Sequence, residues 1–371
     1  MVRIGDYKTT VEDEQVVLEI LRSNRLSEGK YVREFEERWA DFCGTKYAVL
    51  TNSGTSALIL ALEVLKKYTT LRKILTTPLT FIATVNAIVL AGFEPVFSDV
   101  NKETFVIEPC LNADLFMPVH LYGYPVDMQK FPYRFMIEDA AEAHGTMYKG
   151  KPVGSHGLMG CFSFYIAHNI QVGDMGAVTT NSREVYKELK SLKAHGRMCE
   201  CPVCGRLEGR CPHKDADFDP RFTHTRIAYN FKTSEINAAL GINQLKKADW
   251  ILQRRQENVK YLNEGLAGVE ELQLPKHDPT VSYLSYPLII KDESIDRNSF
   301  LNRLSKTVEN RPLFACIPLQ QPAYEHIKNK WVGKLPNAEW LGSRGFHVGV
   351  HQYLTQEELD IMIESIKTCL R

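Results

Sequence analysis

The chain has 371 residues, of which 44% are hydrophobic and 24% are charged, an ordinary composition for a globular protein with a large core. Lys plus Arg and Asp plus Glu each number 45, so the formal net charge is zero. This balance excludes the strongly basic character that steers proteins to nucleic acid. Residues 1–15 lack the apolar segment of a signal peptide, and no apolar stretch approaches the ~20 residues of a membrane-spanning helix. We expect a cytoplasmic protein with no nucleic-acid or membrane partner.

Short β-rich segments alternate with helical patterns through the first half of the chain. Helices are expected at 56–67 and 82–91, and strands at 47–51, 74–77, 95–98, 115–119, 135–138, 161–165 and 176–180. This alternation predicts an α/β fold with a seven-stranded, mostly parallel sheet covered by helices. Chemistry in such sheets gathers just past the carboxyl ends of the strands.

The second half begins with a Cys-rich segment, 197–225, which has little periodicity and is interpreted as an inserted loop. A long amphipathic helix is expected from about 234 to 264, and the remainder mixes strand-like and helical patterns. We therefore predict a large cofactor-binding α/β domain over 1–250, which includes the Cys-rich loop, and a small C-terminal α+β domain over 251–371.

Four of the nine cysteines, Cys199, Cys201, Cys204 and Cys211, fall within thirteen residues. In a reducing compartment such a cluster indicates a metal site more readily than disulfides. Four thiolates can close a structural zinc site or hold an iron–sulfur cluster. The spacing, C-x-C-x2-C-x6-C, matches neither the zinc ribbons nor the ferredoxin motifs, so by itself it leaves both metals open and free thiols as a third alternative.

The first motif with chemical meaning is Asn52-Ser53-Gly54-Thr55-Ser56, between a predicted strand and a predicted helix. Free N–H groups and hydroxyls at a helix N-terminus suit a phosphate. An ordinary N-cap is the alternative, because Ser and Thr are favoured there in any case.

Two further strand exits carry candidate side chains. Asp139, in Glu138-Asp139-Ala140-Ala141-Glu142, could pair with a protonated ring nitrogen, although a helix N-cap is the alternative. Phe81 could lie against a flat cofactor ring, although a core phenylalanine is the alternative. The next motif, Ser163-Phe164-Tyr165-Ile166-Ala167-His168-Asn169, is followed by a glycine-rich turn at 173–177.

Taken together, these motifs resemble the sugar aminotransferases of the DegT/StrS group, fold-type-I pyridoxal phosphate enzymes that act on nucleotide-linked keto-sugars. The order of GTS, TF, EDAA, SF, the glycine turn and Tyr229-Asn230 is shared. The resemblance extends to RLSEGKYVREFEERWADFCG near the N-terminus and LPNAEWLGSRGFHVGVHQYLT near the C-terminus, so it covers most of the chain.

The resemblance implies a homodimer and a role for each matching position. The implied cofactor contacts are the phosphate (Gly54, Thr55, Ser56 and Ser163), the ring face (Phe81), the ring nitrogen (Asp139), the ring hydroxyl (Glu142, where many relatives have Gln), and the phosphate of the other subunit (Asn230).

The chain departs from the group at His168, where the aminotransferases carry the lysine that tethers the cofactor. Imidazole does not form the stable Schiff base of a lysine amine, so the cofactor is expected to rest as free pyridoxamine phosphate. Histidine can still move protons, since its ordinary pKa of ~6.5 suits a general base near neutral pH.

A branch of the group with this change is the nucleotide-linked 4-keto-6-deoxyhexose 3-dehydratases. The stretch from His195-Gly196-Arg197 through Cys211, Phe222-Thr223-His224-Thr225 and Tyr229-Asn230-Phe231-Lys232 resembles the ascarylose-pathway type, which adds an iron–sulfur cluster. The resemblance implies a cluster on the four cysteines, 2Fe–2S favoured over 4Fe–4S. It also implies an NAD(P)H-dependent flavin or iron–sulfur reductase, or a ferredoxin, as electron donor.

The predicted function is therefore C3 deoxygenation of a nucleotide-linked 4-keto-6-deoxyhexose, with His168 as the base and Asp139 keeping the cofactor ring protonated. Tyr165 either positions the base or the ring, or is a packed tyrosine. One alternative is a cluster-free dehydratase of the colitose type with a structural zinc loop. The other is a non-catalytic, lysine-less relative used for binding.

Overall fold

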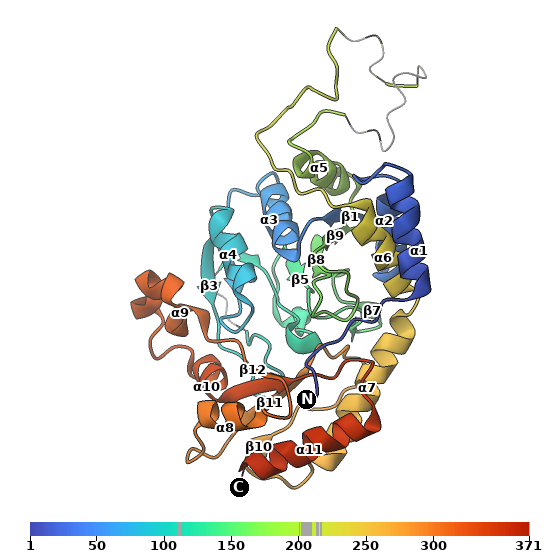
Figure 1. Ribbon diagram of the computed structural model, residues 1–371. Helices are drawn as coiled ribbons and strands as arrows, with labels where there is room; N and C mark the ends of the chain where they lie inside the picture. The colour runs from blue at the N-terminus through green and yellow to red at the C-terminus, as the bar shows by residue number, and fades with distance from the viewer. Residues whose placement is uncertain (110–112, 200, 202–209, 213–214, 216, 371) are drawn as a thin grey trace.

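The computed structural model describes residues 1–371 except 110–112, 200, 202–209, 213–214, 216 and 371 (Figure 1). In chain order its helices and strands are α1 (Val11–Arg22), α2 (Lys30–Phe42), β1 (Tyr47–Thr51), α3 (Gly54–Leu65), β2 (Lys73–Thr76), α4 (Ile82–Leu90), β3 (Glu94–Phe97), β4 (Leu115–Phe116), β5 (Ile137–Asp139), β6 (Met147–Tyr148), β7 (Lys151–Pro152), β8 (Met159–Ser163), β9 (Gly176–Thr180), α5 (Arg183–Lys193), α6 (Glu235–Leu245), α7 (Ala248–Gly265), β10 (Leu272–Gln273), β11 (Tyr286–Ile290), α8 (Arg297–Leu304), β12 (Asn310–Pro312), α9 (Ile317–Gln320), α10 (Pro336–Arg344), β13 (Gly345–Val348) and α11 (Gln356–Leu370).

The central sheet has the strand order β3-β2-β4-β5-β8-β9-β1. Strands β3, β2 and β4 pair in parallel, as do β5 and β8, and parallel bridges from Phe116 to Met136 and from Val119 to Asp139 join the two halves. Only β9 runs against its neighbours, pairing antiparallel with both β8 and β1. The predicted seven-stranded, mostly parallel sheet is confirmed.

The two faces of the sheet are covered by different helices. Successive strand residues point to opposite faces, so Val49 and Val178 pack with the apolar residues of α3, α4 and α5, whereas Leu50 and Ala177 pack with α2 and α6 on the other face. In Figure 1, α3 and α4 accordingly lie on one side of the strands and α1, α2 and α6 on the other. The arrangement is the helix-covered α/β sheet expected from the sequence.

The C-terminal part forms an antiparallel sheet, β10-β11-β13-β12, with α8, α10 and α11 around it (Figure 1). The N-terminus joins this part, because the Val2 N–H donates to the Thr307 carbonyl. The largest apolar cluster draws residues from before and after position 250. The division at 250/251 stays a prediction, and it falls inside α7.

The expected single helix over 234–264 is wrong, because α6 ends at Leu245 and α7 begins at Ala248. The Lys247 N–H donates to Gln244, three residues back, and the chain changes direction. Helix α6 packs on α1 and α2, whereas α7 packs on α11. The break carries no Gly or Pro, and therefore the sequence pattern could not reveal it.

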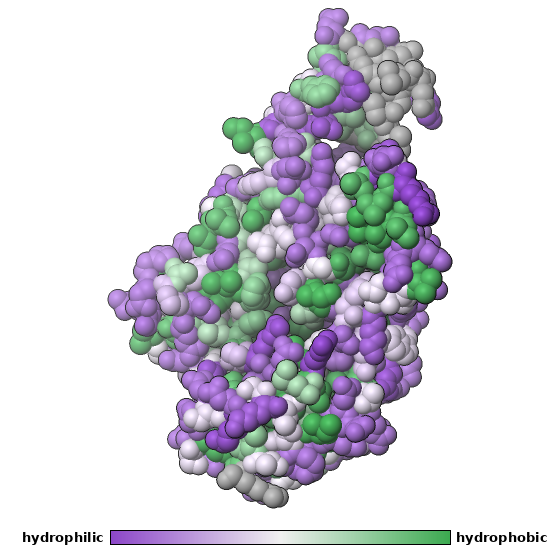
Figure 2. Space-filling view, viewed as in Figure 1, coloured by the Kyte–Doolittle hydropathy of each residue, from purple (hydrophilic) through white to green (hydrophobic). Residues whose placement is uncertain are grey.

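The surface on the face drawn in Figure 2 shows hydrophobic residues in separate patches among polar ones. Within the residues that the structure describes, no helix is long and apolar enough to cross a membrane.

Candidate active site

Asp139 is the last residue of β5, at the carboxyl edge of the sheet, and its side chain is 4% exposed. One carboxylate oxygen accepts a hydrogen bond from the Thr84 hydroxyl (2.7 Å), and the other accepts from the Ala141 N–H (3.2 Å). Burial raises the pKa of Asp139, and these two hydrogen bonds offset part of the rise. A buried carboxylate with no cationic partner among the described residues fits a site whose ligand supplies a positive charge.

Phe81 immediately precedes α4 and is held beside Asp139 by the first turn of that helix. The Thr84 N–H donates to the Phe81 carbonyl (3.3 Å), so the residue that holds Asp139 also closes the turn after Phe81. The Phe81 side chain is 57% exposed, so it is not the core phenylalanine of the alternative interpretation. An exposed aromatic ring next to a buried acid suits a flat, charged heterocycle.

The N-terminus of α3 lies against the end of β8. A Cβ on Gly54 would come within 2.6 Å of the Ser163 Cβ, so only glycine allows this close approach. The Ser53 hydroxyl caps the Ser56 N–H, and the Gly54 and Thr55 N–H groups have no acceptor in the part of the chain that is described. These free donors fit a phosphate, while Ser56 is occupied by the cap.

Glu142 lies one turn beyond Asp139 and is also buried. It accepts a hydrogen bond from the Tyr122 N–H (2.9 Å). Tyr122 has a positive φ of 54°, an unusual conformation for a non-glycine residue. Burial, opposed by the Tyr122 bond and aided by the charge of Asp139, raises the pKa of Glu142 to about 8, so its carboxyl group is largely protonated at neutral pH.

His168 lies on the turn that follows β8. Its backbone N–H donates to the Tyr165 carbonyl (2.8 Å). Its ring Nδ1 is buried without a hydrogen-bond partner among the described residues. Burial, with a smaller contribution from the charge of Arg255, lowers the pKa of His168 to about 4. The imidazole is therefore neutral at physiological pH and able to accept a proton.

Tyr165 is 47% exposed, and its ring lies edge-on to His168 with the centroids 6.3 Å apart. It is not packed in the core.

Lys193, a nearby lysine in the sequence, is committed to another part of the fold. It is 1% exposed and its ammonium pairs with Glu28 (2.8 Å) and Glu36 (3.4 Å). It is therefore not available to take the place of the tethering lysine that the resemblance implies at position 168.

Asn230 is exposed on the segment that connects the Cys-rich loop to α6. Backbone hydrogen bonds hold this segment in place. The Asn52 N–H donates to the Phe231 carbonyl (2.9 Å), and the Phe231 N–H donates to the backbone carbonyl of Lys193 (3.0 Å). Asn230 thus lies next to the Asn52–Thr55 turn while its side chain faces outward.

Two backbone hydrogen bonds join the two ends of the Cys-rich segment. The Met198 N–H donates to the Thr223 carbonyl (2.9 Å), and the Cys199 N–H donates to the Pro220 carbonyl (3.2 Å). Cys211 is buried and Cys199 and Cys201 are partly buried, whereas Cys204 lies outside the described residues. Within the described residues, no three His, Cys, Asp or Glu side chains are grouped as a metal site.

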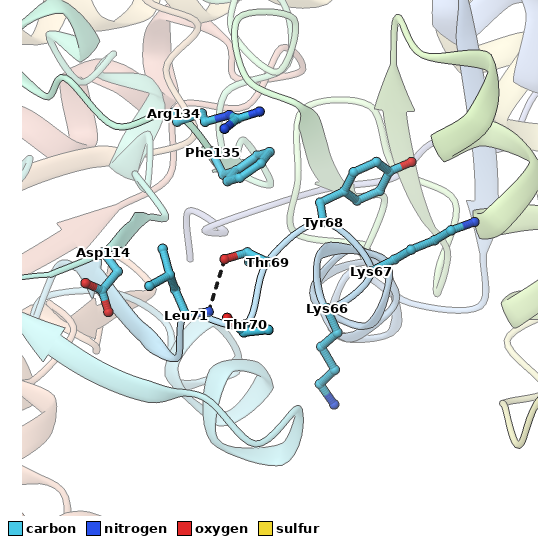
Figure 3. Close-up of a pocket in the computed structure, with 9 residues that line it drawn as sticks. All are labelled: Lys66, Lys67, Tyr68, Thr69, Thr70, Leu71, Asp114, Arg134 and Phe135. Carbon is cyan, nitrogen blue, oxygen red and sulfur yellow. Dashed lines mark hydrogen bonds between the residues drawn. The ribbon is translucent and has the colours of Figure 1, made fainter.

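A cavity of about 470 Å³ lies elsewhere, where Figure 3 shows Asp114, Arg134 and Phe135 opposite Lys66 to Leu71. These residues precede β4, β5 and β2, so the cavity is at the amino ends of the strands. It is on the other edge of the sheet from Asp139 and Ser163 and is not part of the candidate site.

Comparison with known proteins matches residues 8–367 to the model of the DegT/DnrJ/EryC1/StrS aminotransferase family. The chain belongs to this family. Its members modify sugars with pyridoxal phosphate, and this chain shares that cofactor class and their fold.

The relatives of this chain include sugar 3-dehydratases and sugar aminotransferases. The chain is 31% identical to dTDP-4-dehydro-2,6-dideoxy-D-glucose 3-dehydratase of Saccharopolyspora spinosa, over 96% of this chain and 84% of that protein. It is 30% identical to GDP-perosamine synthase of Escherichia coli O157:H7, over 96% of this chain and 95% of that protein. Similar identity to both means that family membership alone leaves the reaction open.

Solved structures agree on the fold. GDP-4-keto-6-deoxy-D-mannose-3-dehydratase of E. coli, with bound hydrated pyridoxal phosphate, superimposes with a TM-score of 0.86 at 23% identity, covering 99% of each chain.

The sequence-predicted residues from Gly54 to His168 thus gather at one edge of the sheet. Sequence analysis missed Thr84, Tyr122 and Arg255. Thr84 follows Phe81 by three residues, a weak helical-spacing signal, and no sequence signal marks the other two.

Proposed function

We propose that this protein removes the C3 hydroxyl of a nucleotide-linked 4-keto-6-deoxyhexose, using pyridoxamine phosphate as its cofactor. The observation that carries the proposal is His168, a neutral imidazole at the position where the resemblance to the sugar aminotransferases implies a cofactor-tethering lysine. A lysine there would make the chain an aminotransferase; a histidine leaves a base without an anchor.

Different residues of the chain would bind different parts of the cofactor. Gly54, Thr55 and Ser163 would hold the phosphate with free N–H groups and a hydroxyl, and Phe81 would cover one ring face. Asp139 would pair with the ring nitrogen. Glu142 would contact the ring hydroxyl, to which its protonated carboxyl group can donate.

When bound, pyridoxamine phosphate supplies an amine for the C4 ketone and a ring that withdraws electrons. Asp139 would maintain that withdrawal by keeping the ring nitrogen protonated. His168 would accept the proton released at the carbon that bears the amine, and Tyr165 would orient His168 or the ring. A neutral imidazole can do this at pH 7 because its proton-accepting form is already populated.

The net reaction is a reduction. The C3–O bond breaks and a C3–H bond forms, which consumes two electrons and two protons and releases water. We propose that Cys199, Cys201, Cys204 and Cys211 hold an iron–sulfur cluster, 2Fe–2S favoured over 4Fe–4S, that delivers single electrons. Zinc at these residues could not do so, since it has no redox chemistry. The electrons would come from an NAD(P)H-dependent flavin or iron–sulfur reductase or a ferredoxin.

The proposal includes a cytoplasmic homodimer. Asn230 is exposed beside the phosphate-binding turn, a position from which it could reach a cofactor in the other subunit.

The proposal is tested by incubating the protein with pyridoxamine phosphate, a reductant system and a nucleotide-linked 4-keto-6-deoxyhexose, and measuring C3 oxygen loss by mass spectrometry. His168→Asn should slow the release about 100-fold or more, the usual contribution of a general base. His326→Asn, at an exposed histidine on the C-terminal part, should leave the rate unchanged. Release by His168→Asn at the wild-type rate would show that another group is the base.

A further inference from the structure

Arg255, on α7, is a buried cation without a carboxylate partner in the described part of the chain. It is 3% exposed, and its Nη1 donates to the carbonyls of Tyr283 (3.2 Å) and Leu284 (2.8 Å). Its Nε is buried with no hydrogen-bond partner among the described residues. Burying an unpaired charge is costly, so this arrangement needs a compensating role.

The segment that Arg255 holds also holds the His168 turn. The Asn169 side chain donates to the Ser282 hydroxyl (2.5 Å) and carbonyl (3.3 Å). Arg255 and the residue next to His168 therefore bind adjacent positions of one short stretch, Ser282 to Leu284. The guanidinium and the turn that carries His168 are therefore anchored on the same short segment.

The other groups that face His168 are neutral. Tyr165 lies on the same turn as His168. His144 lies on the segment after β5, and its ring is nearly perpendicular to that of His168, with the two centroids 6.0 Å apart. His144 Nδ1 accepts the Ile170 N–H (3.2 Å), so its proton is on Nε2. Burial first, and His168 next, lower the pKa of His144 well below the usual range.

In the part of the chain that the structure describes, no salt bridge joins Arg255 to a carboxylate. The N-terminal segment touches this turn through the Asp6 carbonyl, which accepts from Gln171 (2.7 Å). The charge of Asp6 acts on His351, whose pKa burial and Arg255 lower to about 4. Among the described residues, Arg255 is thus the charged group that acts on His168.

We propose that Arg255 is a positioning residue whose buried charge adds to the effect of burial in keeping His168 in its neutral, proton-accepting form. The inference rests on the proposed function for the role of His168 as the base, but the effect on the charge of His168 can be measured without turnover. A nearby cation disfavours a second positive charge, and it acts in the same direction as burial.

The test is a pH titration of the His168 ring by NMR in the full-length protein, with the resonances assigned by their absence in His168→Asn. Arg255→Met, which removes the charge at similar length, should shift the titration midpoint upward, whereas Arg255→Lys should keep it close to wild type. The acid limb of the pH–rate profile should move the same way. Equal shifts in both variants, or no shift in either, would overturn the proposal.

A second variant leaves Arg255 in place, in case its removal prevents folding. His351→Glu puts a carboxylate at a position on which the charge of Arg255 already acts, and it should raise the midpoint of His168, while His351→Gln should not. A midpoint unchanged by His351→Glu would also overturn the proposal. The two hypotheses fail separately. A wild-type His168 that titrates near its ordinary pKa contradicts the role of Arg255, whereas C3 oxygen loss at the normal rate in His168→Asn contradicts the proposed function.

Discussion

At the residue scale, two adjacent carboxylates at the end of β5 have different roles. Glu138 is fully buried and accepts hydrogen bonds from the N–H groups of Gly154 (2.7 Å), His156 (2.7 Å) and Gly157 (2.6 Å), and His120 lies 3.2 Å away. Burial alone would raise the pKa of Glu138, but His120 and the backbone donors make the net shift downward. The segment 154–157 is therefore a turn wrapped around Glu138, whereas Asp139 has two donors and faces the site.

This difference predicts opposite outcomes for two nearly isosteric changes. Glu138→Gln places an amide against backbone donors and should lower the free energy of unfolding by about 2–4 kcal/mol. Asp139→Asn should change it by less than about 1 kcal/mol but weaken pyridoxal phosphate binding, because the carboxylate that we propose to pair with the ring nitrogen loses its charge. Urea unfolding without cofactor and absorbance titration with cofactor measure the two effects. Equal losses of stability would contradict the division of roles.

At the element scale, the strands could be predicted from the sequence because each is a short apolar run between turn residues. Strand β9 was found with its bounds, but its antiparallel direction could not be predicted, because direction depends on where the chain crosses the sheet. Site residues could likewise be predicted where they follow a strand directly. Asp139 and His168 stand at strand exits, whereas Thr84 and Arg255 lie on helices and act on partners far away in sequence.

At the scale of the whole molecule, four histidines whose pKa values are lowered in the folded state make the fold sensitive to acid. Burial is the first cause in each case, and it lowers the pKa of His168 and His351 to about 4, that of His347 to about 3 and that of His144 well below its usual value. Each is neutral when folded but takes up a proton when unfolded below pH ~6.5. Their contribution to stability is present above that pH and is lost as the pH falls toward 4.

Glu142 and Asp139 act in the opposite sense, since their raised pKa values make the folded state bind protons that the unfolded state releases. The four histidines outnumber the two carboxyl groups, so the cofactor-free protein should lose unfolding free energy as the pH falls from 7 to 5. Urea unfolding at a series of pH values measures this loss. A urea midpoint that stays constant or rises on acidification would show that these four histidines are already protonated in the folded protein.

The central claim for the molecule is that it reduces its substrate, using electrons that enter through the Cys-rich loop. The most direct measurement is the iron, sulfide and zinc content, with the visible spectrum, of protein purified without oxygen. We predict a coloured protein with iron and sulfide, whose iron is lost in Cys211→Ser and kept in Cys369→Ser, a cysteine outside the loop. A colourless protein with stoichiometric zinc and no iron would contradict the claim.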